Sequence, residues 1–172
     1  GRCARYRKLG RTADRSTASP HASQHERLYL MIESIVSRLS SEVPILEHRV
    51  EGAGNFADLM QRNALPQHTP AAHVLPLGLI GRQADAGAGA FTQGIEEAIA
   101  VILTIRNHTP AGQKALAELR DVIFAIVNAI AGWAPSDEIG VFRLTRGSIL
   151  NASKGTVVYQ IDFAITDQLR IL

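Results

Sequence analysis

Hydrophobic residues recur at helical spacing in two stretches of the chain. The first begins near Met31, and its apolar positions are Ile32, Ile35, Val36, Leu39 and Val43. This spacing predicts an amphipathic helix, which Pro44 ends because the residue before a proline is disfavoured in helical conformation. The second and stronger stretch contains Ala115, Leu116, Leu119, Val122, Ile123, Ile126, Val127 and Ile130. Thr109 and Pro110 are expected to start this helix, and residues 132–135 to stop it.

Shorter elements are predicted between these two helices. Residues 45–50 indicate a first strand and residues 51–54 a turn, after which Asn55 is expected to cap a short helix. Residues 71–77 indicate a second strand, in which Pro76 is typical of a sheet edge or a strand end. Residues 95–106 are apolar on both faces in their middle, as in a central strand that is covered on both sides.

The stretch between these two strands, residues 78–94, is predicted to be a long mobile loop. It contains five glycines and no proline, and its apolar residues follow no period. Loops of this length inside a compact domain are usually functional. It carries no phosphate-binding lysine, no set of metal ligands and no nucleophile with a base. It therefore indicates assembly rather than catalysis.

The last third of the chain indicates a hairpin. Residues 139–150 form its first arm and residues 151–155 its turn. In the second arm the apolar positions Val157, Tyr159, Ile161, Phe163 and Ile165 alternate with mostly polar ones, as in an antiparallel strand over a core. The predicted fold class is α/β (α+β), with one mixed, largely antiparallel sheet, the long helix packed across one face and a C-terminal β-hairpin.

Charge divides the chain into two parts. Residues 1–30 hold seven basic and two acidic groups, whereas the remaining 142 residues hold 11 basic and 14 acidic groups. We therefore expect a basic N-terminal arm (1–30) and a single domain (31–172), the arm being a docking segment, a nucleic-acid-binding segment or translated upstream sequence. The one cysteine, Cys3, excludes an intramolecular disulfide and a cysteine-based zinc site. No apolar run is long enough to span a membrane.

No constellation of residues indicates an enzyme, a cofactor or a metal. The six histidines lack metal-ligand spacing, and His48 with Glu47 and Glu51 is better explained as a solvated strand edge. Glu96 and Glu97 are adjacent on a strand, so they face opposite ways and make a poor acid–base pair. The glycine pairs at 52/54 and 87/89 lack the context of a P-loop or of a dinucleotide site.

Three other residues are candidates for contacts. Arg143 and Arg146 are expected to face opposite sides of the first hairpin arm, where they would line a polar channel, meet an acidic partner or simply be exposed. Trp133 either closes the end of the core or anchors an interface.

Four segments in order resemble the tail terminator (tail completion) proteins of long-tailed bacteriophages. They are residues 71–78 before the predicted loop, residues 93–106, residues 115–133 with their Gly-Trp-Ala-Pro end, and residues 144–150 followed by a turn and residues 157–163. Together they cover residues 31–172, and the likeness lies in the ordered set rather than in one motif.

The resemblance implies a structural virion protein without catalysis or cofactor. It implies a homohexameric ring on the last ring of the tail tube, which stops tube polymerisation and meets the head–tail connector (head completion) protein. DNA would only pass through the lumen, no membrane is involved, and assembly takes place in the host cytoplasm. Its long loop suggests contacts with a neighbouring subunit or a tail protein. The predicted interface residues are Gly78, Leu79, Ile80, Gly81, Arg82, Gln83, Asp85, Phe91, Gln93, Arg143 and Arg146.

Two alternatives remain. One is another neck or tail-tube ring component, which would stack on itself into filaments. The other is a small-ligand-binding or nucleic-acid-binding regulator that uses the basic arm, which would bind DNA in a salt-sensitive way.

Overall fold

The computed structural model describes residues 24–87, 90–106, 112–135, 140–153 and 155–171. The elements in chain order are α1 (Gln24–Glu42), the 3₁₀ helix η1 (Pro44–Leu46), β1 (Val50–Glu51), α2 (Ala53–Gln61), β2 (Ala71–Gly87), β3 (Ala90–Arg106), α3 (Gly112–Ile130), β4 (Arg143–Ser153) and β5 (Thr156–Ile171). The start of α3 predicted at Thr109 and Pro110 lies outside these residues. None of the described helices is long and apolar enough to cross a membrane.

The strands form one five-stranded sheet in the order β1-β2-β3-β5-β4. β1 is parallel to β2, whereas the other neighbouring pairs are antiparallel. The predicted α+β class, the mixed and mostly antiparallel sheet and the C-terminal β4–β5 hairpin are therefore confirmed.

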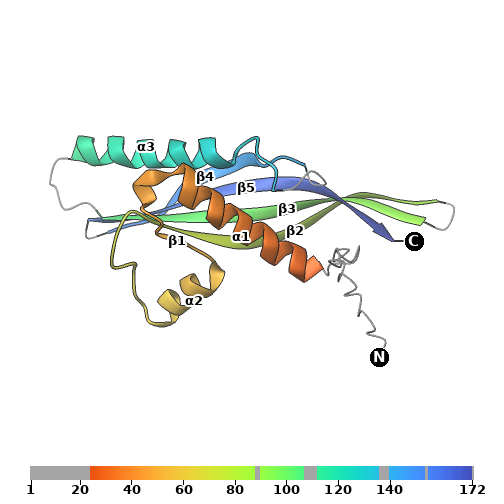
Figure 1. The fold of residues 1–172 in the computed structure, drawn as a ribbon, viewed down its shortest axis with the longest axis horizontal. Helices are drawn as coiled ribbons and strands as arrows, with labels where there is room; N and C mark the ends of the chain where they lie inside the picture. The colour runs from red at the N-terminus through yellow and green to blue at the C-terminus, as the bar shows by residue number, and fades with distance from the viewer. Residues whose placement is uncertain (1–23, 88–89, 107–111, 136–139, 154, 172) are drawn as a thin grey trace, which may run out of the picture.

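Helices α1 and α3 pack together over one face of the sheet, which we call the helix face (Figure 1). The apolar stripes of both helices form one core with the sheet residues that point toward them. These sheet residues are Ala72, Val74, Ile99, Val101, Leu103, Ile161, Phe163 and Ile165. The core confirms the predicted stripes, apart from Ala115 and Leu116, whose side chains lie outside the described residues, and it confirms the side of β5 that faces inward.

The second face of the sheet carries the alternate residues and is partly covered by α2, which lies across the sheet from α3 (Figure 1). The Phe56 ring of α2 lies 5.4 Å from the ring of His73, the residue next to Ala72 and Val74 on β2. Ala100 and Ile102 are buried on this face of β3. The prediction that the middle of β3 is covered on both sides is thus confirmed.

The strand predicted at residues 45–50 is mostly wrong. Pro44–Leu46 form a turn of 3₁₀ helix, Glu47 and His48 have positive φ angles, and only Val50–Glu51 pair with the sheet. A proline starts a helical turn readily because its φ angle is fixed near the helical value. The short helix begins at Ala53 with Gly52 at its N-cap, so Asn55 is not the cap.

The long loop predicted at residues 78–94 is also wrong. β2 and β3 pair along almost this whole stretch, from Gly78 opposite Ala98 to Gly87 opposite Ala90. Register shifts between Pro76 and Gly78 and between Gly81 and Ala84 break the period of two, which hid the strand in the sequence. Gly78 has a φ of +143°, a conformation that other residues rarely adopt.

The end of α3 agrees with the prediction, whereas the hairpin turn differs from it. α3 stops at Ile130 and Gly132 has a φ of +78°, as the predicted helix stop requires. The predicted hairpin turn is too long, since β4 continues to Ser153 and β5 starts at Thr156. Trp133 stacks on Phe142 at the edge of the core, which favours core closure over an interface role.

Residues 24–30, assigned above to the basic arm, belong to α1. Leu28 packs against the core, and Arg27 forms an ion pair of 2.9 Å with Asp167 of β5. We therefore place the boundary between arm and domain before α1, and the division itself remains a prediction.

Truncation distinguishes the two boundaries. Deleting residues 1–23 is expected to leave the free energy of unfolding unchanged. Deleting residues 1–30 removes the Leu28 contact and the Arg27 ion pair, and should lower it by about 1–3 kcal/mol. Urea unfolding of both truncated proteins measures this. Equal stability of the two would show that the first turns of α1 contribute nothing to the domain.

Candidate assembly surface

The sheet has two edges that carry exposed apolar side chains. β4 forms one edge of the sheet, and every residue in it except Ser148 is exposed. Its exposed apolar residues are Leu144, Ile149 and Leu150. An edge strand of this kind presents unpaired N–H and C=O groups that can accept another strand.

The second edge belongs to β2. β1 pairs only with Ala72 and His73, so β2 from Val74 onward has no strand on that side among the described residues. Leu77, Leu79 and Ile80 are exposed there. Pro76 lies in this unpaired part, which fits the predicted sheet edge.

The β2–β3 hairpin extends beyond the ends of α1 and α3 (Figure 1). Nine of the predicted interface residues lie on it: Gly78, Leu79, Ile80, Gly81, Arg82, Gln83 and Asp85 on β2, and Phe91 and Gln93 on β3. The Gln93 amide donates a hydrogen bond of 2.9 Å to the carbonyl of Arg82. The residues predicted to form a loop therefore lie in a paired β-hairpin that projects from the domain.

Glu96 brings two of the predicted interface residues together. Its carboxylate accepts hydrogen bonds from Arg82 of β2 through one oxygen and from Arg143 of β4 through the other. The Glu96 side chain is 8% exposed, whereas those of Arg82 and Arg143 are 57% and 52% exposed. The Arg82 hydrogen bond, with the charges of both arginines, lowers the Glu96 pKa although burial opposes this, so the carboxylate is ionised at neutral pH.

Arg143 and Arg146 lie on the same face of the sheet, contrary to the prediction. Arg143 is opposite Ala164 and Arg146 is opposite Asp162, two residues apart on β5. A bulge between Leu144 and Arg146 adds one residue to β4, and so reverses the side expected from simple alternation. Arg146 forms no ion pair with any described residue.

Glu96 and Glu97 do face opposite sides, as predicted. Glu97 lies on the helix face near Asp167 and Arg27, and burial is the main cause that raises its pKa, with Asp167 adding to the effect. The carboxylate form is therefore less favourable in the folded chain than in the unfolded one. The folded state loses stability as the pH rises above the carboxyl's ordinary pKa.

Replacing this carboxylate should stabilise the domain. Glu97→Gln is expected to increase the free energy of unfolding at pH 7 by less than about 1 kcal/mol, since Glu97 is only half-buried and Arg27 is near. The gain should disappear near pH 3, where the carboxyl is protonated in both states. Thermal unfolding at both pH values measures this, and a less stable variant at pH 7 would contradict it.

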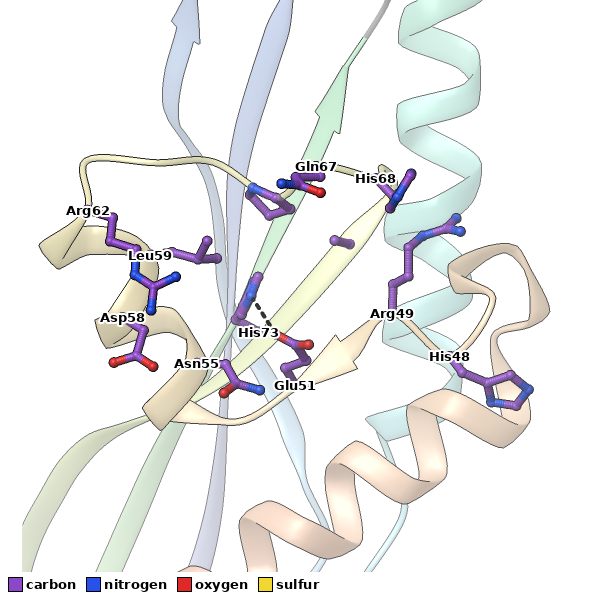
Figure 2. Close-up of a pocket in the computed structure, with 12 residues that line it drawn as sticks. His48, Arg49, Glu51, Asn55, Asp58, Leu59, Arg62, Gln67, His68 and His73 are labelled. Carbon is purple, nitrogen blue, oxygen red and sulfur yellow. Dashed lines mark ion pairs between the residues drawn. The ribbon is translucent and has the colours of Figure 1, made fainter.

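A pocket of about 400 Å³ lies at the other end of β2, between α2, β1 and the segment that leads into β2 (Figure 2). His73 is buried in its floor, with Nε2 3.5 Å from a carboxylate oxygen of Glu51. Burial lowers the His73 pKa, although Glu51 opposes this, so the imidazole is neutral. His48 and His68 also line the pocket, but no group of three potential metal ligands occurs among the described residues.

Residues 26–171 match the family of phage tail terminator proteins. The chain belongs to this family. The match covers both edges of the sheet, the projecting hairpin and Glu96 with its two arginines. As a member of a structural, non-enzymatic family, the terminator is a structural protein of the virion tail, in agreement with the resemblance found in the sequence.

The fold is shared by a chain from a solved virion structure. A chain from a structure titled "Virion of native gene transfer agent (GTA) particle" superimposes with a TM-score of 0.51 at 12% sequence identity. The alignment covers 81% of the terminator and 95% of that chain. No curated protein sequence matches the terminator.

The sequence had signals for part of this surface. The glycine-rich stretch and the two arginines of β4 were predicted as contact residues, but Glu96 was considered only as half of an acid–base pair. Glu96 lies on the same face of its strand as the apolar residues Ala98, Ala100 and Ile102. An acidic residue at such a position indicates a buried carboxylate that requires a cation as its partner. The sequence could not identify that cation, because Arg82 and Arg143 meet Glu96 only through strand pairing.

Proposed function

We propose that this terminator closes into a homohexameric ring by pairing the β4 edge of one subunit with the β2 edge of the next. Strands β2, β3, β5 and β4 alternate in direction, because each neighbouring pair is antiparallel. In a ring whose strands run along the ring axis, rotation preserves the direction of each strand, so β4 of one copy runs antiparallel to β2 of its neighbour. This relation between the two open edges carries the proposal.

The side chains on the two edges are compatible with such pairing. Both edges expose apolar residues that burial would remove from water. The only charged residues of β4 are Arg143 and Arg146. The unpaired part of β2 carries Arg82, which pairs with Glu96, and Asp85, which forms no ion pair with a described residue. A heterologous contact of this kind closes into a ring when the rotation between copies is a whole fraction of a turn.

Membership of the tail terminator family supports a position for this ring at an end of the tail. We place it at the head-proximal end of the tail, on the last ring of the tail tube protein, where it blocks the addition of further tube subunits. Its other side would meet the head–tail connector, with DNA passing through the lumen. The projecting β2–β3 hairpin would supply contacts to a neighbouring subunit or a tail protein.

The native mass of the purified protein tests the ring. We expect a hexamer, and a monomer under all conditions would overturn the proposal. Stacking of the rings into filaments would instead support a tail-tube component, because tube proteins polymerise on themselves.

Charge exchange tests which edges meet. Asp85→Arg and Arg146→Asp should each weaken the ring if the neighbouring β2 is shifted along β4 so that Asp85 lies opposite Arg146, because each change then places like charges across the contact. The double variant restores opposite charges and should recover assembly. Analytical ultracentrifugation of the four proteins measures this. Additive losses in the double variant would show that the two residues do not face each other.

A further inference from the structure

The contact between Arg82, Glu96 and Arg143, which we call the arginine fork, lies on the second face of the sheet. Ile80 and Thr166 are the cross-strand partners of Glu96, and Arg143 is opposite Ala164, the next residue of β5 on this face. Both oxygens of the single carboxylate are used, one for each arginine. The fork thus holds two guanidinium groups from strands far apart in the sequence beside each other.

The charges of the fork are not balanced. Two arginines share one carboxylate, which leaves a net charge of one positive unit on a surface where both guanidinium groups are more than half exposed. Each arginine donates to Glu96 through only one terminal nitrogen of its guanidinium group. The other guanidinium N–H groups have no hydrogen-bond partner among the described residues. On the same face, the Asp162 carboxylate accepts a hydrogen bond of 2.6 Å from Gln160. No described carboxylate other than Glu96 pairs with either arginine.

We propose that the arginine fork binds a carboxylate side chain of a neighbouring virion protein. An acidic side chain placed between the two guanidinium groups would accept their remaining N–H donors and neutralise the fork. Arginine suits this role because its planar guanidinium group can donate two parallel hydrogen bonds to a carboxylate. Glu96 acts as a positioning residue, because it fixes both arginines before the partner arrives and so reduces the entropy lost on binding.

The surroundings of the fork favour a protein over DNA. Ile80 of β2 is the cross-strand partner of Glu96 of β3 and is 52% exposed. An apolar side chain therefore adjoins the two arginines. Arginine beside apolar residues is typical of the centre of a protein interface. DNA binding relies on a broad positive surface, yet residues 31–172 hold 14 acidic against 11 basic groups.

This inference rests on membership of a virion protein family and not on the hexameric ring. The ring is tested by mass, whereas the fork is tested by the binding of an acidic ligand. A terminator that is monomeric but binds acidic peptide through the fork would overturn the first proposal and keep the second.

The experiment measures binding of a fluorescent hexaglutamate peptide to the full chain by anisotropy. Arg82→Gln and Arg143→Gln should each weaken this binding by roughly tenfold or more, the effect of losing a charge-assisted hydrogen bond. Arg170→Gln is the matched control, since Arg170 is an exposed arginine of β5 outside the fork. It should bind the peptide like the wild type. Melting temperatures of all variants identify any loss of fold.

Two further measurements distinguish recognition of a carboxylate from a general effect of charge. Arg82→Lys and Arg143→Lys keep the charge but lose the paired donors, so they should recover only part of the affinity. A short DNA duplex replaces the peptide in the last arm, and it should bind weakly and equally to wild type and variants. The proposal is overturned if the peptide does not bind the wild type, if the fork variants bind it unchanged, or if DNA binding depends on the fork more than peptide binding does.

Discussion

Ile126→Asp is expected to abolish folding of the terminator. Ile126 lies in the C-terminal half of α3, is fully buried and packs in the core between the helices and the sheet. A carboxylate at this position would be surrounded by the apolar core, and burying an unpaired charge costs several kcal/mol. Since the net stability of a domain is typically about 5–15 kcal/mol, the variant should be unfolded or aggregated at 25 °C.

Neighbouring residues of the same helix give graded controls. Phe124 is 52% exposed, so Phe124→Asp should leave the circular dichroism and the melting temperature almost unchanged. Ile123 is only partly buried, and Ile123→Asp should lie between the two. The measurement is thermal unfolding of the soluble fractions. A soluble Ile126→Asp variant with normal melting would show that the predicted stripe of α3 is not part of the core.

The helices and the central strands could be predicted because their burial follows a single period. Apolar residues recur at helical spacing in α3 and at every second position in β5, because each element is regular and has one buried side. The core contains residues that these patterns identify. The apolar middle of β3 similarly indicated that it is covered on both faces. Periodicity is a reliable signal wherever an element has constant geometry and one environment on each side.

The β2–β3 hairpin could not be predicted in the same way. Two bulges shift the side to which its residues point, and its tip extends beyond the helices, so no constant buried side exists to mark a period. Gly78 and Gly81 then suggest a loop. Gly78 has a local reason, because it adopts a positive φ. A side chain at Gly81 would meet only the flexible end of Gln93, whose amide nitrogen lies 2.8 Å from the Cβ position.

The arginine fork depends on the same hidden geometry. The bulge in β4 places Arg143 and Arg146 on one face, and only the complete pairing of β2, β3, β5 and β4 brings Arg82 and Arg143 to Glu96. Arg82 and Arg143 were both predicted as contact residues. Their proximity could not be predicted, since residues separated by 61 positions (143 minus 82) meet only through the topology of the sheet.

The strongest effect on assembly is expected from the combined change Ile149→Lys and Leu150→Lys at the β4 edge. Both side chains are more than half exposed in the subunit, so their replacement removes little from its core. Lysines on an edge strand oppose pairing with another strand, because their charges would have to leave water at the contact. The variant should therefore melt like the wild type but remain monomeric at concentrations at which the wild type forms rings.

Phe124→Lys provides the matched control for this loss of assembly, because it replaces an equally exposed apolar residue on α3, away from both edges. It should assemble normally, which separates the effect of the β4 edge from a general effect of added positive charge. Sedimentation velocity gives the oligomeric state of both proteins, and thermal unfolding gives the stability of the subunit. If the edge variant still forms a hexamer, the subunits meet through surfaces other than β4, and pairing of β4 with the neighbouring β2 is excluded as the contact that closes the ring.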